Sequence, residues 1–182
     1  AVKEIIRDFE SIERTGVEKP KVGLVGEILV KFHPNANNFA AETIEAEGGE
    51  CMVPMLMDFF TYSLYNTHFS AEKLGKSKAI DKLSRFGIWY VERFRKMVNK
   101  PLSKSKYYHA PVHIDKLAEK AKSVLSVGNY TGEGWLLTAE MLELIEAGAP
   151  NIICAQPFAC LPNHVTGKGM IKESVRGLDI YI

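Results

Sequence analysis

Residues 151–170 have the most definite local pattern in this chain, because an apolar run is followed there by residues that cannot extend a strand. Residues 151–155 form the apolar run, which predicts a central strand covered on both faces. Pro157 and Pro162 follow, and each removes a backbone donor and restricts the residue before it. Residues 156–164 are therefore expected to form a shaped loop.

The predicted loop carries side chains suited to binding or catalysis. In an open parallel sheet, ligands bind at the loops that follow the carboxyl ends of the strands. Cys160, Asn163 and His164 lie in such a loop and would bring a thiol, an amide and an imidazole to that edge. Gly167 then lets the backbone approach a ligand closely, before a helix predicted over residues 170–175.

The other apolar runs predict an α/β fold. Strands are expected near residues 22–28 and 51–54, with a helix between them that begins at the asparagines around residue 37, which are good capping residues. Strand, helix and strand in this order form a βαβ unit with parallel strands. Together with the runs at 151–155 and 178–182, they predict a mostly parallel, open sheet of the Rossmann-like kind.

Residues 58–147 follow a different pattern, because apolar residues recur there only at helical spacing. The helices expected in this helical insertion span residues 58–69, 80–98, 114–127 and 135–147, and another is expected over residues 2–13. The length of 182 residues suits one well-packed domain, so we expect a single α/β domain over residues 1–182. Because the chain begins within a charged helix and stops on an apolar run, we also expect it to be a fragment of a longer polypeptide.

Charge is divided unevenly along a chain whose formal net charge is only +1. Residues 71–110 contain eleven Lys or Arg and three acids, a net charge of +8, whereas residues 40–58 contain five acids and no base. The basic segment is either a solvated helix face or a basic cap that meets the phosphates of a coenzyme A ester or an acidic partner. The small net charge and the absence of a long apolar run in the sequence favour neither a nucleic acid nor a membrane as partner.

The three cysteines, at scattered positions, predict a reducing compartment rather than a disulfide framework, and hence a cytoplasmic protein. Cys51 and Cys154 lie in apolar strand runs, where a free thiol packs as a small hydrophobe. Cys160 differs, because its position in a polar loop suits either a buried thiol or a metal ligand.

Glu27 and His164 are candidate acid–base residues, and each has a plainer alternative. Glu27 follows the first predicted strand and reaches the same sheet edge as Cys160 if the two strands are parallel. It could instead cap a helix or pair with Lys31. His164 could donate a proton to a carbonyl substrate or close the loop by a backbone hydrogen bond. The run at 132–134 offers N–H groups to an anion or caps a helix, and the sequence has neither a dinucleotide fingerprint nor a Walker A loop.

Three runs of the sequence resemble one known family. They are VGLVGEILVKFHPNAN at residues 22–37, GEGWLLTAEMLELIEAG at 132–148 and CAQPFACLPNHVTGKGMIKE at 154–173. The chain resembles the 2-hydroxyacyl-CoA dehydratase family, and most closely the dehydratase-like portion of activators of 2-hydroxyglutaryl-CoA dehydratase, also named CoA-substrate-specific enzyme activases. The resemblance covers most of the chain from Lys21 onward. Members of the superfamily are oxygen-sensitive iron–sulfur proteins that receive one electron from an ATP-hydrolysing activator.

The resemblance implies an iron–sulfur electron-handling module of a 2-hydroxyacyl-CoA dehydratase, which is a lyase, or of its activator. Cys160 would be a metal ligand of a 4Fe–4S cluster, and its neighbours Asn163 and Gly167 would belong to the same cofactor site. Such a cluster takes about four thiolates, so it would not be complete within this chain. The remaining ligands would come from other domains of the parent chain or from a partner subunit, and an acyl-CoA would be the ligand. The alternative is a non-catalytic scaffold domain that docks a partner subunit through its basic helices.

Overall fold

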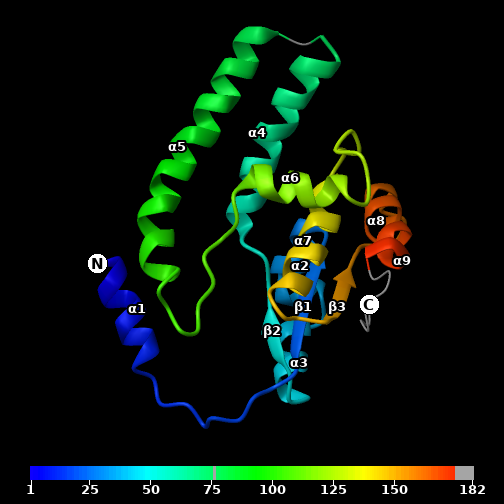
Figure 1. The fold of residues 1–182 in the computed structure, drawn as a ribbon. Coiled ribbons are helices and arrows are strands. Elements are labelled where there is room, and N and C mark those ends of the chain that lie inside the picture. Colours follow the sequence, from blue (N-terminus) through cyan, green and yellow to red (C-terminus); the bar gives the residue numbers. More distant parts are fainter. Residues whose placement is uncertain (76, 175–182) are drawn as a thin grey trace. The chain divides into compact units, whose positions relative to one another are not determined.

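The α/β part of the protein is built on a small, open, all-parallel sheet. A computed structural model describes residues 1–75 and 77–174. Its three strands are β1 (Lys21–Gly26), β2 (Glu50–Met52) and β3 (Asn151–Ala155), in the order β2-β1-β3 (Figure 1). All three were predicted from their apolar runs. The strand predicted at 178–182 lies outside the described residues.

The position of β3 in the sheet differs from the sequence-based expectation. Residues 151–155 were expected to form a central strand, but among the described strands β1 is central and β3 lies at an edge. Ile152 is buried, whereas its neighbour Ile153 is 43% exposed, so only one face of β3 is well covered. A short run of apolar residues gives the strand but not its neighbours, because both edge and central strands accept Val and Ile.

The chain divides into two compact units, and the boundary between them falls inside a helix. The helical unit contains residues 1–18 and 63–113, and the sheet unit contains residues 19–62 and those from 114 onward. The helix that crosses the boundary is α4 (Leu56–Lys73). The helical segment predicted over residues 58–147 thus contributes to both units.

The sheet unit contains most of the short helices. They are α2 (Ile28–Phe32), η1 (Pro34–Ala36), α3 (Ala40–Ala46), α6 (Ile114–Lys122), α7 (Gly134–Glu146), α8 (Leu161–Thr166), η2 (Lys168–Met170) and α9 (Ile171–Ser174). The predicted helices at 114–127 and 135–147 are confirmed as α6 and α7. The predicted asparagine cap is also confirmed, since Asn37 Oδ1 accepts a hydrogen bond from the Ala40 N–H at 3.0 Å.

Two helices of this unit were not predicted. The loop expected over residues 156–164 ends at Cys160, because α8 already begins at Leu161. Pro162 does not prevent this helix, since the missing N–H of a proline in the first turn would have no partner within the helix. Residues 28–32 form α2, where the sequence indicated only a segment leaving the first strand.

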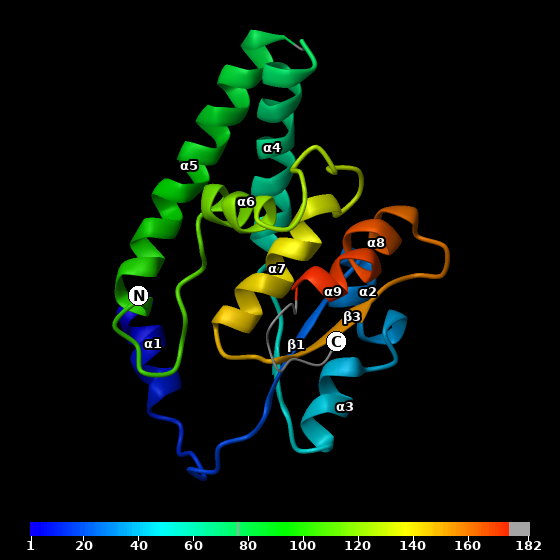
Figure 2. The ribbon, with the colours of Figure 1, turned by 45° about the vertical axis from the view of Figure 1, so that its right-hand side comes forward.

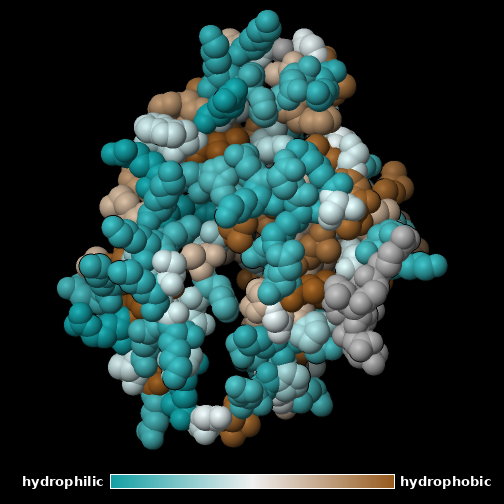
Figure 3. Space-filling view, viewed as in Figure 1, coloured by the Kyte–Doolittle hydropathy of each residue, from teal (hydrophilic) through white to brown (hydrophobic). Residues whose placement is uncertain are grey.

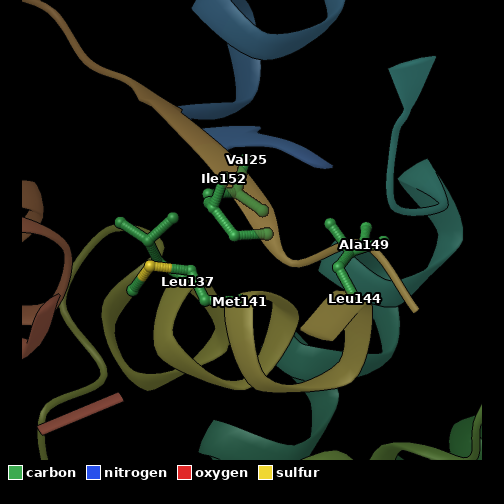
Figure 4. Close-up of a cluster of buried hydrophobic side chains, with 6 residues drawn as sticks. All are labelled: Val25, Leu137, Met141, Leu144, Ala149 and Ile152. Carbon is green, nitrogen blue, oxygen red and sulfur yellow. The ribbon is translucent and has the colours of Figure 1, made fainter. Parts of the chain in front are cut away.

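The core of the sheet unit lies between α7 and the sheet. Figure 4 shows six of its buried side chains, which come from both elements and the turn between them: Val25, Leu137, Met141, Leu144, Ala149 and Ile152. In Figure 2, α7 lies across β1 and β3. The other side of α7 packs on α6, whose Ile114, Ala118 and Ala121 are fully buried. A helix covered on both sides reads as apolar nearly all round, as α7 does.

The helical unit consists of α1 (Val2–Glu10), the second part of α4 and α5 (Lys78–Leu102). His68 on α4 and Asp81 on α5 are joined by a 2.5 Å contact between Nδ1 and Oδ1. The Glu10 carboxylate of α1 accepts a hydrogen bond from Ser105 Oγ at 2.6 Å. The helices predicted at 2–13, 58–69 and 80–98 are confirmed, with shifted ends. No helix in the described ranges is both long and apolar enough to cross a membrane.

Gly26 is expected to be the least replaceable residue of the sheet. Its φ is +146°, and a Cβ there would lie 1.8 Å from the Ala155 carbonyl oxygen. Gly26→Ala should therefore lower the free energy of unfolding by about 3 kcal/mol or more, through backbone strain and displacement of β3. Urea unfolding of the variant measures this loss.

Gly48→Ala is the matched control for this prediction. Gly48 also has a positive φ, +89°, but nothing lies within 4 Å of its missing Cβ. The control should lose only about 1 kcal/mol, from the backbone conformation alone. Equal losses in the two variants would contradict the close approach of β1 and β3.

Candidate functional site

The candidate site lies where β1 and β3 end. The two strands are parallel, and their last residues, Gly26 and Ala155, pair with each other. The chain then enters α2 after β1, and a short loop and α8 after β3. Glu27 and the segment from Cys160 to Asn163 therefore leave the sheet at the same edge, as the sequence predicted.

Asn163 joins three segments at this edge. Its side chain is fully buried. With the amide oriented to satisfy both neighbours, its Nδ2 donates to Glu133 Oε2 at 3.0 Å, and its Oδ1 accepts from the Glu27 backbone N–H at 3.2 Å. The other oxygen of Glu133 accepts from the Ile28 N–H at 3.0 Å. The loop before α7, the start of α2 and the first turn of α8 are thus held together by polar groups that are fully paired.

The Glu27 side chain caps a helix. Glu27 is the N-cap of α2, and its Oε2 accepts from the Val30 N–H at 2.9 Å. A carboxylate is favourable at this position because the first N–H groups of a helix have no partner within the helix. The sequence left two plainer roles for Glu27, helix capping and an ion pair with Lys31. The structure confirms helix capping, and Lys31 pairs with another residue. The acid–base role of Glu27 stays a prediction.

Lys31 instead forms a buried ion pair with Glu140 of α7. Its Nζ lies 2.8 Å from both carboxylate oxygens, and the two side chains are 5% and 4% exposed. Burial raises the pKa of Glu140 to about 7, although the charge of Lys31 acts in the opposite direction. Asp58 and Glu133, both buried, raise it further. A lysine and three carboxylates therefore share the interior beside the sheet edge.

Cys160 occupies the start of α8. It is the N-cap residue of that helix, and its thiol makes no capping hydrogen bond in the described structure. The side chain is partly buried, whereas Phe158 and Leu161 on either side of it are 102% and 73% exposed. Ala159 has a φ of +60°, a left-handed conformation in which a non-glycine residue is strained. The thiol is thus held beside two exposed apolar side chains at the end of β3.

His164 and two further polar residues that follow the strands, His33 and Asp58, are placed differently from one another. His164 is exposed on α8, and the bond at this position is made by its backbone N–H, which donates to the Cys160 carbonyl at 3.0 Å. His33 is exposed at the end of α2. Asp58 is buried, within electrostatic range of Glu140. At this edge of the sheet, Asn163 is thus hydrogen-bonded directly to the Glu27 backbone. Cys160 lies one helical turn before Asn163.

Close packing around Gly167 leaves no room for a larger side chain. A Cβ there would lie 2.5 Å from the Asn163 carbonyl oxygen, 2.9 Å from Leu137 and 3.2 Å from Cys154 Sγ. The close approach is thus made by the protein itself, and the proposed contact with a cofactor stays a prediction. Burial raises the pKa of the Cys154 thiol to about 11, and the charge of Glu140 adds to this. Cys154 is therefore a protonated thiol packed against the core, as its apolar run indicated.

The turn at 132–134 lies against α8. A Cβ on Gly132 would lie 3.2 Å from Cγ of Pro162. The hydroxyl of Tyr62 donates toward the carbonyl oxygens of Tyr130 and Gly132, at 2.9 and 3.0 Å, and so fixes the turn. The Glu133 carboxylate accepts a hydrogen bond from the Ile28 N–H. The turn therefore positions its own anionic side chain, and the predicted binding of an external anion stays a prediction.

A pocket of about 590 Å³ opens between the end of β2 and the helices α2 and α3. Most of its lining is apolar, with Lys31, Asn37 and Glu42 as the polar exceptions. The apolar side chains are those of Leu24, Phe32, Pro34, Ala41, Val53, Pro54, Met55, Leu56 and Met57. The sequence did not indicate this pocket, because its walls come from four separate segments.

The sequence interpretation also missed the Lys31–Glu140 pair and the role of Glu133. One signal was available for Glu140. It is the single charge among residues 134–142 of an otherwise apolar helix, and a buried charge needs a partner. The identity of that partner was not readable, because 108 residues separate the two.

The described residues do not hold a complete metal site. No group of three or more His, Cys, Asp or Glu side chains in residues 1–75 and 77–174 is arranged to bind a metal ion. Cys51, Cys154 and Cys160 are all free thiols. In comparisons with known proteins, no family model, curated protein or solved structure matches the chain.

The buried carboxylate should make stability depend on pH. Because the pKa of Glu140 is raised in the folded chain, the folded state binds its proton more tightly than the unfolded state does. Its contribution to stability is therefore present below about pH 4.5 and is lost as pH rises through about 7. Relative to Glu140→Gln, the wild-type free energy of unfolding should fall by roughly 1–3 kcal/mol between about pH 5 and about pH 8. Urea unfolding across this range tests the sign; a relative rise would contradict it.

Removal of Lys31 should expose the cost of the buried carboxylate. Lys31→Met leaves Glu140 without its cation, which should lower the free energy of unfolding by about 3–5 kcal/mol near pH 8. The double variant Lys31→Met/Glu140→Leu removes both charges and should recover most of that loss. Thermal and urea unfolding of the three proteins decide the matter. A single variant as stable as the double variant would mean that the pair is not buried in solution.

Proposed function

We propose that the chain is an iron–sulfur electron-handling module of a 2-hydroxyacyl-CoA dehydratase or activase system. The sequence resemblance suggests this role, and the position of Cys160 is the observation that carries it. A partly buried thiol with no capping role stands at the carboxyl edge of a parallel sheet, which is the edge where ligands bind in such folds. In this proposal the sheet unit is a Rossmann-like module, and helices between β2 and β3 form its insertion.

Cys160 fits the role of one cluster ligand, but the residues present do not fit a complete cluster. A 4Fe–4S cluster takes about four thiolates. Cys51 pairs with Val22 inside the sheet and Cys154 is packed against Gly167, and no three such side chains among the described residues form a metal-binding group. In the proposal the other ligands come from a partner subunit or from sequence beyond these residues. The exposed Phe158 and Leu161 would then be covered by that neighbour.

The remaining parts of the site would hold the cofactor loop and the substrate. Asn163 fixes α8, and with it the thiol, by its two buried hydrogen bonds. Gly167 allows α8 to pack closely on Leu137. The pocket of about 590 Å³ has an apolar lining suited to an acyl group of an acyl-CoA. His164 is exposed on α8 and does not line this pocket, and Glu27 is held as a helix cap. In the proposal these two residues remain the acid–base candidates. Free thiols favour a cytoplasmic location.

A second function, that of a non-catalytic scaffold, is favoured by a different observation. The long helix α5 carries Lys82, Arg85, Lys96 and Lys100 on its exposed side, and none of these four forms an ion pair within the described residues. A cluster of like charges without partners is typical of a docking surface for an anionic or acidic partner. In this function the helical unit would bind a partner subunit.

Cys160→Ser tests the first proposal. In the full-length parent protein, assembled with its partner and purified without oxygen, this variant should fold normally but lose iron and sulfide, because a hydroxyl does not replace a thiolate ligand. Iron and sulfide content are measured beside a thermal melt. The 182-residue chain alone, purified in air, should contain no iron.

Cys154→Ser is the matched control. It places a hydroxyl next to the core and should lower the free energy of unfolding by about 1–3 kcal/mol while iron content stays unchanged. If Cys160→Ser kept its full iron content, the thiol would not be a ligand. The docking function would then be the better account of the chain.

A further inference from the structure

The exposed side of α5 is apolar along most of its length. Ile80, Leu83, Tyr90, Phe94 and Met97, which we call the apolar stripe, are between 51% and 69% exposed. Their spacing of three, seven, four and three residues places them on one face of the helix at heptad positions a and d. The rings of Tyr90 and Phe94 contact each other edge to face, with centroids 5.0 Å apart. Figure 3 shows apolar and hydrophilic side chains interleaved over α5.

The most buried residues of α5 are polar, and the apolar Ile88 and Val91 on the same side are only partly buried. Ser84, Glu92 and Arg95 are 5%, 6% and 8% exposed, and Arg95 Nη1 donates to Glu92 Oε1 at 3.0 Å. Asp81 is bound to His68 of α4. A helix normally turns its apolar residues inward. In α5 only part of the apolar surface is turned inward, and the apolar stripe is not the face that packs within the helical unit.

A basic ridge runs beside the apolar stripe. It consists of Lys82, Arg93, Lys96 and Lys100, which lie on one flank of the helix with Trp89 among them. Arg93 lies over the Trp89 ring at 5.9 Å, and Trp89 is 55% exposed. No ion pair involves these four side chains in the part of the chain that the structure describes. An apolar seam with aromatic side chains and a flank of one charge is typical of a helix-binding interface.

We propose that the apolar stripe and basic ridge of α5 dock an amphipathic helix of a partner protein whose flank is acidic. This inference deepens the docking function proposed above and does not involve the cluster. The heptad spacing suits a narrow helix–helix seam, and the ridge lacks anions, which an acidic flank would supply. A second copy of α5 would not supply them, because its acids, Asp81 and Glu92, are paired on the inward side.

The experiment uses a designed peptide as the probe for the unidentified partner. An amphipathic helix about three heptads long, with Leu at a and d and Glu on one flank, is titrated into the protein. A matched peptide has Lys in place of each Glu. Trp89 reports binding through its quenching by acrylamide, since it is exposed whereas Trp135 is fully buried. Trp89→Phe assigns the signal.

The acidic peptide should bind with a dissociation constant of about 1–100 μM and protect Trp89 from acrylamide. High salt should dissociate the peptide and remove this protection. The double variant Tyr90→Ser/Phe94→Ser should weaken binding about tenfold or more without a change in thermal stability, because both side chains are half exposed. Leu74→Ser is the control, since Leu74 is 59% exposed directly after the end of α4, outside the stripe. Its affinity for the peptide should match that of the wild type.

Other results would overturn the inference, and they separate it from the broader docking function. Equal binding of the lysine peptide, or binding only to vesicles of phosphatidylcholine and phosphatidylserine in equal parts, excludes an acidic helix as the occupant. Self-association in sedimentation, or a Trp89 already shielded in the protein alone, means that the stripe is covered by something else. If Lys96→Glu/Lys100→Glu abolishes binding but Tyr90→Ser/Phe94→Ser does not, the docking function through basic residues is supported. The proposal that the apolar stripe binds a helix is then wrong. If the acidic peptide does not bind at all, both fail.

Discussion

The buried carboxylate of Glu140 is the constraint on which the sheet unit depends. It lies in the middle of α7, the helix that packs on the sheet with one side and on α6 with the other. A charge in that position costs several kcal/mol unless a cation reaches it. Lys31 reaches it from α2, and the short helix α2 is in turn begun by the Glu27 cap. The pair therefore ties the segment after β1 to the central helix, and it does so through the interior rather than at the surface.

The same edge of the sheet is held by hydrogen bonds of one neutral amide, Asn163, and one carboxylate, Glu133. Asn163 and Glu133 pair with the backbone N–H groups of Glu27 and Ile28, so the start of α2 is held from two sides. Networks of this kind stabilise one arrangement because each lost bond leaves a buried polar group without a partner. Cys160 gains a defined position from this network, since it precedes Asn163 by one helical turn. A fixed thiol at the edge of a parallel sheet is what a shared cluster would require, and it is also compatible with a thiol that only packs.

The helical unit has an exposed apolar stripe on α5. In α5 Glu92 and Arg95 are buried and paired with each other, while the five residues of the apolar stripe are exposed. An exposed row of large apolar side chains is typical of a surface that a partner covers in the functional state. The site at the sheet edge and the stripe on α5 draw on different residues in different units, so each can be tested without disturbing the other.

The sequence alone determined most of the secondary structure and part of the site. Apolar runs and helical spacing predicted all three described strands and α1, α3, α4, α5, α6 and α7, because those signals are local. Parallel strands then placed Glu27, Cys160 and Asn163 at one edge. Only the tertiary structure decided that β3 lies at the edge of the described sheet, that Lys31 pairs with Glu140 rather than with Glu27, and that the apolar face of α5 is turned outward. Hydrophobic periodicity shows that a helix has an apolar face, but it contains no information on which neighbour covers that face or which distant charge enters the interior.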